Sequence, residues 1–225
     1  MTYPAILYLS THIIADPGDA LLNAWILAWD AHQILSGDFL SMFDANIFHP
    51  YNNTLAYSEH LLGLAPLATP LYAITQNPVL TLNLTFLFCL TLSGITTYYL
   101  ALYLTHHKAA SLFAGIIFAY FPWRFSHLGH LQLQALQWFP IIFLSAHRLL
   151  ETGRWRYLTG LYVFSILQIT SCGYYAMYLF LLVPLFFVVA YPSITRRMPL
   201  SLIQIGVYFF MVCLTSIPFL WPYFK

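Results

Sequence analysis

The fold class is decided by the stretch PVLTLNLTFLFCLTLSGITTYYLALYLT, which runs from Pro78 to Thr105 and contains no charged side chain. A helix needs about 20 apolar residues to cross the roughly 30 Å hydrocarbon core of a bilayer, so this stretch is long enough to span a membrane. A second uncharged run extends from Tyr157 to Ile194. In the whole chain 60% of residues are hydrophobic and 7% are charged, whereas soluble domains carry about 25% charged residues. The sequence therefore predicts an all-α, multi-pass transmembrane protein.

Outward from this run, the apolar sequence is sufficient for a bundle of about seven spans. Tyr3–Ile14 is apolar but shorter than a full span, and we interpret it as the outer end of a truncated first span. The segment His60–Gln76 is also apolar, but Pro66 and Pro70 interrupt it. We expect it to form a broken helix that dips into the membrane without crossing it. Six further spans are expected at Val79–Leu104, Ala109–Pro122, Leu131–Leu149, Tyr157–Ser171, Tyr174–Ala190 and Leu200–Pro218.

Negative charge is concentrated between Ile14 and His60, where six of the seven acidic residues lie. A helical pattern extends from Ala20 to Leu35 in this stretch. Its leucine, isoleucine and tryptophan side chains form one stripe, while Asp19, Asn23 and Asp30 fall on another face. A helix with two such faces is predicted to lie along the membrane surface.

The loops between the predicted spans differ in charge, and this difference predicts the orientation. Every second loop is basic, and these loops contain Lys108, Arg148, Arg154, Arg156, Arg196 and Arg197. Lys and Arg are enriched in cytoplasmic loops, so the acidic loop is predicted to face the periplasm or a lumen. The expected organisation is one transmembrane domain over residues 1–225, in which residues 15–60 form a first outer loop that carries the surface helix.

The carboxylates of this loop are the candidate catalytic groups. Asp19 occupies a position suited to capping the predicted surface helix, and Asp16 precedes it by three residues. A carboxylate at the membrane surface can act as a general base or a metal ligand; the alternative is a helix cap alone. Glu59 and His60, with His49, are candidates for completing an oxygen and nitrogen site for Mg²⁺ or Mn²⁺, and the alternative is ordinary loop polarity.

A second polar cluster follows within Phe121–Gln134. Arg124, His127 and His130 recur at intervals of three, close to one face of a helix. Arg124 departs from the charge pattern because it lies on the predicted outer side. An anionic lipid phosphate would account for a cation there. The alternative is that these side chains only snorkel and form hydrogen bonds at the interface.

Several segments of the chain resemble the GT-C glycosyltransferases and, more closely, the uncharacterised bacterial multi-pass membrane proteins placed beside them. The segments are GDALLNAWILAWD at 18–30, LAPLATPLY at 64–72, the basic turn at Lys108, AASLFAGIIFAYFP at 109–122 and the arginine that follows it. The motifs are short, although the layout covers most of the chain. From this resemblance we expect the chain to correspond to the N-terminal part of a longer protein.

The resemblance implies transfer of a sugar from a polyprenyl-phosphate donor to an acceptor on the outer face of a bacterial inner membrane. The position that matches the family's essential aspartate is Asp19, and Arg124 would face the carrier phosphate. Many relatives place a second acid shortly after that arginine, where this chain has His127, His130 and Gln132. This departure leaves the need for a divalent metal open.

Three functional hypotheses remain from the sequence. In the first, Asp19 and Asp16 orient or deprotonate the acceptor, and the substrate is bound by Arg124, His127, His130, Glu59 and His60. The second is a membrane transporter or lipid flippase. No Asp or Glu lies within a predicted span, which argues against ion-coupled transport but not against passive transport. The third is a catalytically inactive scaffold.

Membrane lipids are the expected partners, and a net charge of +1 without a dense basic patch argues against nucleic acid as a partner.

Overall fold

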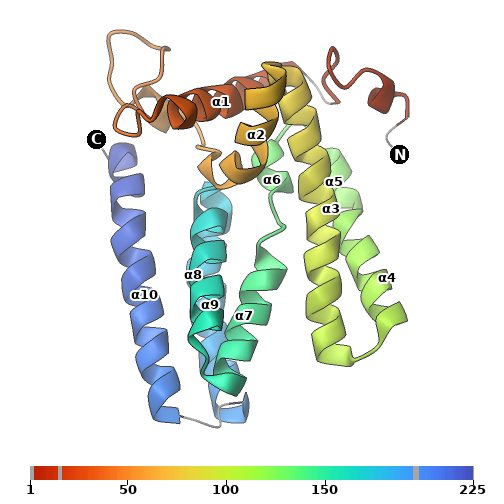
Figure 1. Cartoon of the computed structure of the whole chain (residues 1–225), viewed down its shortest axis with the longest axis vertical. Helices are drawn as coiled ribbons and strands as arrows, with labels where there is room; N and C mark the ends of the chain where they lie inside the picture. Colours follow the sequence, from red (N-terminus) through yellow and green to blue (C-terminus); the bar gives the residue numbers. More distant parts are fainter. Residues whose placement is uncertain (1–2, 15–16, 195–197, 225) are drawn as a thin grey trace.

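The computed structural model describes residues 3–14, 17–194 and 198–224 of the chain. It is 77% helical, and the described residues include no strand. Figure 1 shows two parts: a group of upright helices, and a cap of helices and loops that lies across their upper ends. The predicted all-α class is confirmed.

The upright helices run up and down in sequence order (Figure 1). They are α3 (Pro78–Thr105), α4 (Lys108–Ala119), α7 (Phe139–Thr152), α8 (Trp155–Ile169), α9 (Gly173–Ile194) and α10 (Met198–Leu220). Helices α3 and α4 form an antiparallel pair whose backbones touch at two glycines. A Cβ atom on Gly115 would lie 2.6 Å from the carbonyl oxygen of Gly94. Small residues permit this close approach, as at many helix contacts in membranes.

Three helices of the described residues are long and apolar enough to cross a membrane: Pro78–Thr105, Gly173–Ser193 and Leu202–Phe224. The outer surfaces of the last two expose large apolar side chains, among them Val188 and Ile203, as expected of surfaces that face lipid. The chain is therefore a membrane protein. The expected number of about seven spans is not confirmed, because α4, α7 and α8 have 12, 14 and 15 residues. At about 1.5 Å per residue they are shorter than the hydrocarbon core.

The expected span Leu131–Leu149 is wrong as one continuous helix. It is divided into α6 (Leu131–Gln134) and α7, with an irregular connection between them. The break leaves backbone carbonyl groups without hydrogen bonds inside a helix, and side chains from other helices donate to them. Gln168 Nε2 donates to the carbonyl oxygen of Ala135 at 2.7 Å, and the Tyr175 hydroxyl donates to that of Leu133 at 2.7 Å. Irregular backbone inside a membrane protein is stable where the protein itself supplies such partners.

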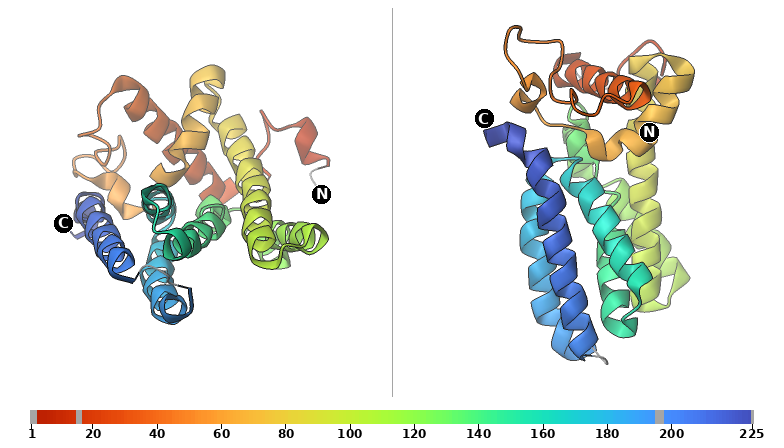
Figure 2. Two further views of the ribbon diagram at one scale, coloured as in Figure 1. Left: turned by 60° about the horizontal axis from the view of Figure 1, so that its bottom comes forward. Right: turned by 60° about the vertical axis from the view of Figure 1, so that its left-hand side comes forward.

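The cap contains α1 (Pro17–Ser36) and α2 (Ala65–Thr75), and both lie across the upper ends of the upright helices (Figures 1 and 2). The crosswise orientation of α1 is the one predicted for a surface helix. Helix α1 buries one side against the bundle through Ala20, Ala24, Leu27 and Ala31. The cap also contains the 3-10 turns η2 (Thr54–Tyr57) and η3 (Leu62–Leu64); α5 (Pro122–Ser126) follows α4, and η4 (Trp221–Phe224) follows α10.

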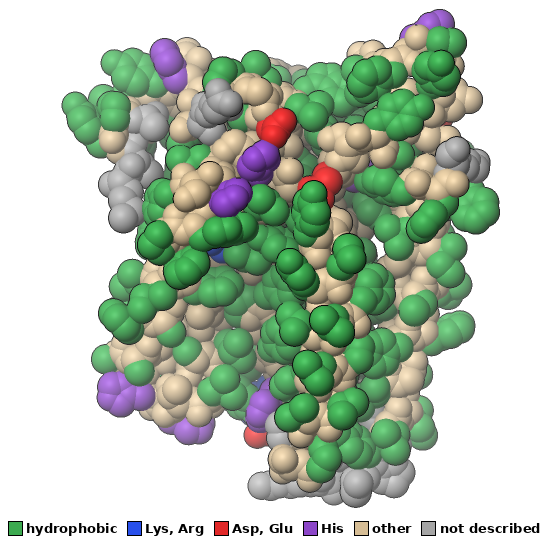
Figure 3. Space-filling view, turned by 180° about the vertical axis from the view of Figure 1, so that it is seen from behind, with side chains coloured by type: hydrophobic (Ala, Val, Ile, Leu, Met, Phe, Trp, Pro, Cys, Tyr) green, Lys and Arg blue, Asp and Glu red, His purple; other side chains and the backbone are tan. Residues whose placement is uncertain are grey.

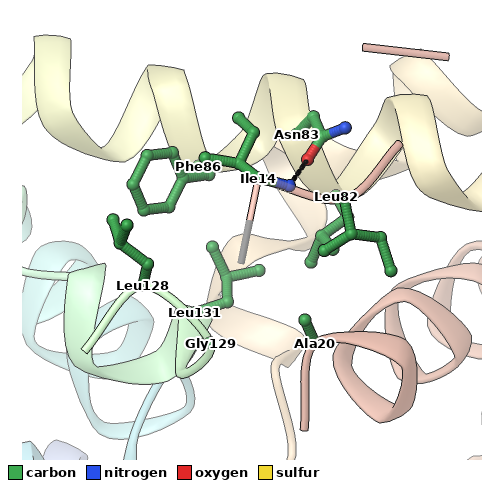
Figure 4. Close-up of a pocket in the computed structure, with 9 residues that line it drawn as sticks. Ile14, Ala20, Leu82, Asn83, Phe86, Leu128, Gly129 and Leu131 are labelled. Carbon is green, nitrogen blue, oxygen red and sulfur yellow. Dashed lines mark hydrogen bonds between the residues drawn. The ribbon is translucent and has the colours of Figure 1, made fainter. Parts of the chain in front are cut away.

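The N-terminal segment does not continue the bundle as a helical span, contrary to expectation. It forms the short turn η1 (Ala5–Leu7) and then an irregular segment that runs along α3. The side-chain amide of Asn83, buried in α3, binds this irregular segment. The amide nitrogen donates to the carbonyl oxygens of Leu9 and His12, each at 2.8 Å. Its oxygen accepts from the Ile14 N–H at 3.4 Å (Figure 4). The small space beside these contacts has a volume of about 10 Å³, room for roughly one water molecule.

Candidate functional site

The polar face predicted for α1 contacts two distant segments of the chain. Near the start of the helix, the carboxylate of Asp19 lies 3.1 Å from His130 Nδ1. One turn later, the Asn23 amide donates to the carbonyl oxygen of Gly129 at 3.2 Å and to Gln132 Oε1 at 3.3 Å. Further along, Asp30 lies 3.5 Å from His60 Nδ1. Helix α1 therefore brings the acidic loop and the histidine-containing segment together.

The pair Asp19–His130 is open to solvent, with 61% and 40% of the two side chains exposed. The helix begins at Pro17, so Asp19 lies within the first turn and not at the N-cap position expected from the sequence. Asp16, its predicted partner, lies outside the described residues. The ring of His127 lies 6.2 Å from that of His130 and 4.4 Å from that of Trp123, measured between centroids. An exposed carboxylate–imidazole pair contributes little to stability, and both groups are accessible from solvent.

The pair Asp30–His60 is buried, in contrast to the first pair. The side chains are 1% and 0% exposed, and the rings of Phe43 and Phe219 lie within 5.3 Å of the imidazole centroid. His60 Nδ1 accepts a hydrogen bond from the Leu62 N–H at 3.1 Å, so the ring is neutral and its proton is on Nε2. Burial lowers the pKa of His60 to about 3 and raises the pKa of Asp30 well above its usual value.

Glu59 lies in the loop between η2 and η3, and its carboxylate reaches the start of α9 and the side chain of Gln132. Its carboxylate accepts from the Gly173 N–H at 3.2 Å, and the Cys172 thiol lies 3.9 Å away. A carboxylate at this position interacts favourably with the positive end of the helix dipole. Burial nevertheless raises the pKa of Glu59. Gln132, which also accepts from Asn23 of α1 at 3.3 Å, therefore connects Glu59 with the segment that carries His130.

Arg124 points into the bundle, although the sequence suggested a side chain on the outer surface. It is 1% exposed, and its guanidinium lies 5.5 Å from the centre of the Phe118 ring. Nη2 donates to Ser93 Oγ at 3.0 Å. Nε and Nη1 have no hydrogen-bond partner among the described residues. No acidic group pairs with this cation in the described part of the chain. A buried cation without a counter-charge is costly unless a ligand supplies the negative charge.

Arg124 also lines a groove of about 510 Å³ between α3, α4 and α5. The other groove residues are mostly aromatic or aliphatic: Thr97, Ala110, Phe113, Ala114, Ile117, Phe118, Phe121, Trp123 and Leu136. An apolar groove with one cationic residue in its lining matches an amphiphile that has a hydrocarbon chain and an anionic head.

Three features of this region were not predicted from the sequence. Asp30 was placed on the polar face of α1, but its burial against His60 depends on the loop that returns beneath the helix. Ser93 lies in the middle of an apolar run and gave no signal. Gln134 was given no role within the predicted span Leu131–Leu149, yet its amide donates to the carbonyl oxygens of Arg124 and His127, at 3.0 and 2.9 Å. It therefore holds the segment that carries both predicted residues.

The described residues contain no group of three or more His, Cys, Asp and Glu side chains able to hold a metal ion. The predicted set around Glu59, His60 and His49 is therefore not assembled as a ligand set for Mg²⁺ or Mn²⁺.

On the face in Figure 3, histidine and carboxylate side chains lie close together in the upper part, above a surface that is mainly hydrophobic. No protein-family model, curated protein or solved structure matches the chain.

Proposed function

We propose that the chain transfers a sugar from a polyprenyl-phosphate-linked donor to an acceptor at the outer face of a membrane. The observation that carries this proposal is the apolar groove that ends at Arg124. Its volume of about 510 Å³ falls in the range of small-molecule sites, roughly 300–1,000 Å³. Behind the groove wall, Nε and Nη1 of Arg124 are buried and have no hydrogen-bond partner among the described residues. A lipid phosphate would supply the missing acceptors and the missing negative charge.

In the proposed step, the acceptor hydroxyl attacks the anomeric carbon of the sugar. A bond forms between the acceptor oxygen and that carbon, and the bond from the carbon to the phosphate oxygen breaks. The electron pair leaves with the lipid phosphate, whose charge Arg124 stabilises. The carboxylate of Asp19 takes the hydroxyl proton, and His130, 3.1 Å away, orients that carboxylate. No step is assigned to a metal ion, because the described donor set does not fit one.

The proposal includes a topology. The end of the bundle opposite the cap carries Lys108, Arg148, Arg154 and Arg156, at the starts or ends of α4, α7 and α8. By the positive-inside rule this end is cytoplasmic, and the cap faces the periplasm of a bacterial inner membrane. In this arrangement the shorter helices α4, α7 and α8 are also embedded in the bilayer. Arg196 and Arg197, which the sequence places at the same end, lie outside the described residues.

Donor binding is the direct test. Ala114 lines the Arg124 groove and is partly exposed, so Ala114→Trp fills the groove without contacting the core. Leu112→Trp changes the opposite side of the same helix and is the matched control. Vesicles containing the protein would be tested with a photoreactive polyprenyl phosphate and with radiolabelled polyprenyl-phosphate sugars. We expect crosslinking and transfer to fall in Ala114→Trp and to persist in the control. Equal labelling of both variants would refute the groove as the donor site.

A lipid flippase is the second candidate, because the same groove would accept a lipid that is moved and not cleaved. The two functions differ in product. A transferase leaves free polyprenyl phosphate and a glycosylated acceptor, whereas a flippase returns the intact donor from the other leaflet. Chromatography of the labelled lipid after incubation separates these outcomes.

A further inference from the structure

A second groove lies at the end of the bundle opposite the cap, where α3 and α7 end and α8 begins (Figure 1). Its volume is about 520 Å³. Most of its wall is apolar or aromatic, through Tyr99, Leu102, Ile141 and Leu144, and Arg148 also lines it. The groove therefore combines a hydrocarbon-like surface with a cation.

The guanidinium of Arg148 is positioned by aromatic rings. Its Cζ atom lies 4.5 Å from the centre of the Tyr103 ring and 6.0 Å from that of the Tyr157 ring. These contacts hold the group without using its N–H donors. The side chain is 40% exposed, and Nη1 lies 3.5 Å from Glu151 Oε2. A guanidinium has several N–H donors, so others remain for an acceptor in the groove.

Positive charge is in excess at this end of the groove. The guanidinium of Arg156 lies 4.6 Å from the centre of the Tyr157 ring, and its Nη2 donates to the Tyr157 hydroxyl at 2.6 Å. Arg148 and Arg156 thus approach the same ring. Glu151 is the only acidic residue that follows Glu59 in the sequence. Two cations therefore share one carboxylate, and a further anion would be attracted to them.

The apolar wall indicates that this anion belongs to a lipid. The side chains of Leu102 and Leu144 are partly exposed in the groove, and Tyr99 is 57% exposed. A soluble phosphate would leave this wall uncovered, whereas an acyl chain would cover it. Figure 3 shows histidine side chains again at this end, below a mainly hydrophobic middle, as expected where a bilayer meets water. Basic pockets between transmembrane helices on the cytoplasmic side bind anionic head groups.

We propose that the groove between α3 and α7 binds an anionic phospholipid of the leaflet opposite the cap. Its phosphate lies at Arg148, and an acyl chain lies along Leu102 and Leu144. The inference goes beyond the transferase proposal, because the Arg124 groove is at the other end of the bundle. It shares with that proposal only the embedding of α7 and α8 in the bilayer, and it holds whether or not the chain transfers a sugar.

The test compares two phospholipids with identical chains. Phosphatidylcholine vesicles containing the protein would carry a trace of diazirine-labelled phosphatidylglycerol or of diazirine-labelled phosphatidylcholine. We expect phosphatidylglycerol to label peptides from the last turns of α3 and α7 at least about fivefold more strongly, the effect of roughly one basic side chain near an anionic head group. Equal labelling by the two lipids would overturn the proposal.

Competition distinguishes a lipid from a soluble phosphate. Excess unlabelled phosphatidylglycerol should reduce the labelling. A soluble glycerol phosphate, present on both sides of the vesicle membrane, should not, because it lacks the chains. Effective competition by glycerol phosphate would assign the groove to a soluble anion and overturn the lipid assignment.

A steric variant tests the groove itself. Leu102→Trp fills the groove from a partly exposed position and should abolish the preferential labelling. Leu104→Trp is the matched control, because Leu104 is exposed on the same helix and does not line the groove. Unchanged preference in Leu102→Trp would show that the lipid contacts only the outer surface of α3, and the assignment would fail.

A charge variant separates a site from general attraction to a basic surface. Arg148→Gln keeps N–H donors but removes the charge, so most of the preference for phosphatidylglycerol should be lost. Arg154→Gln removes an exposed cation at the same end that does not line the groove, and the preference should persist. Thermal midpoints in detergent would show that both variants are folded. An equal loss of preference in the two variants would indicate diffuse attraction and overturn the proposal.

Discussion

His130 Nδ1 lies 3.1 Å from a carboxylate oxygen of Asp19, which joins the first turn of α1 to the segment just before α6. Both side chains are partly exposed, and Asn23, one turn further along α1, donates to Gly129 and Gln132 of the same segment. The pair is therefore held by neighbouring contacts and remains accessible to a substrate.

The first prediction concerns Asp19 as the proposed general base. Asp19→Asn keeps the size of the side chain but removes its ability to take a proton. We expect the rate of sugar transfer to fall by about 10²–10⁴ with little change in donor binding. Asp38→Asn is the control, because Asp38 is exposed in the same loop and makes only a 3.4 Å contact to the Ser41 N–H. Transfer by Asp19→Asn at the wild-type rate would remove Asp19 from the mechanism.

The second prediction separates a binding role of Arg124 from a structural one. Arg124→Met keeps much of the side-chain volume and removes a buried cation. Two of its nitrogens have no hydrogen-bond partner among the described residues. Burying a charge without a counter-charge is costly, so we expect no loss in the free energy of unfolding when this charge is removed. Binding of polyprenyl phosphate should weaken at least about tenfold, the effect of losing a charged hydrogen bond. Thermal denaturation in detergent and equilibrium lipid binding measure the two quantities. Destabilisation with unchanged binding would assign Arg124 a structural role only.

The third prediction is a pH dependence of stability that originates at His60. Its pKa is lowered from 6.5 to about 3 by burial, so between these values the unfolded chain binds a proton that the folded chain does not. This contribution to stability is complete above pH 6.5 and is lost as the pH falls towards about 3. His60→Asn should lack it, so the difference in thermal midpoint between wild type and variant should shrink on acidification. A constant difference would contradict the neutral, buried imidazole.

Asp30 acts in the opposite direction. Its pKa is raised above 3.8, so the folded chain keeps a proton that the unfolded chain has lost. Stability therefore decreases as the pH rises from 3.8 through the raised pKa. Asp30→Asn should remove this decrease, and measuring it beside His60→Asn separates the two contributions.

The fourth prediction concerns Gly63, which joins the cap to the end of α8. Its N–H donates to the carbonyl oxygen of Thr170 at 3.0 Å. A Cβ atom there would overlap the carbonyl oxygen of Leu167, part of the α8 backbone. Gly63→Ala should destabilise the protein by about 1–3 kcal/mol or more, as overpacking does. Gly206→Ala in α10 is the control: nothing lies within 4 Å of its Cβ position, and we expect a stabilisation of up to about 1 kcal/mol. Similar thermal midpoints for the two variants would contradict the close approach.

The fifth prediction concerns sidedness. In a Cys213→Ser background, which removes the exposed native thiol, a cysteine at Asn52 in the cap should react with an impermeant maleimide added outside cells. A cysteine at Arg154, between α7 and α8, should react only after permeabilisation. Both original side chains are exposed. Labelling of both positions from the same side would refute the proposed orientation.

Much of the architecture follows from local sequence pattern. The uncharged run from Pro78 to Thr105 forms α3 with those same bounds, because a long apolar segment in lipid must satisfy its backbone hydrogen bonds within a helix. The two faces of α1 likewise predicted its crosswise position. The break between α6 and α7 was not predictable, because it depends on Gln168 and Tyr175 binding carbonyl groups from other helices.

The sequence by itself determined the helical membrane class and the surface helix, since apolar length and helical periodicity are local properties. Only the tertiary structure decided which polar groups are buried. The inward side chain of Arg124, its contact with Ser93 and the enclosed pair Asp30–His60 depend on α3, α5 and the returning loop packing together. Burial determines whether a charge is solvated, paired or left for a ligand, and it results from contacts between segments that are distant in the chain.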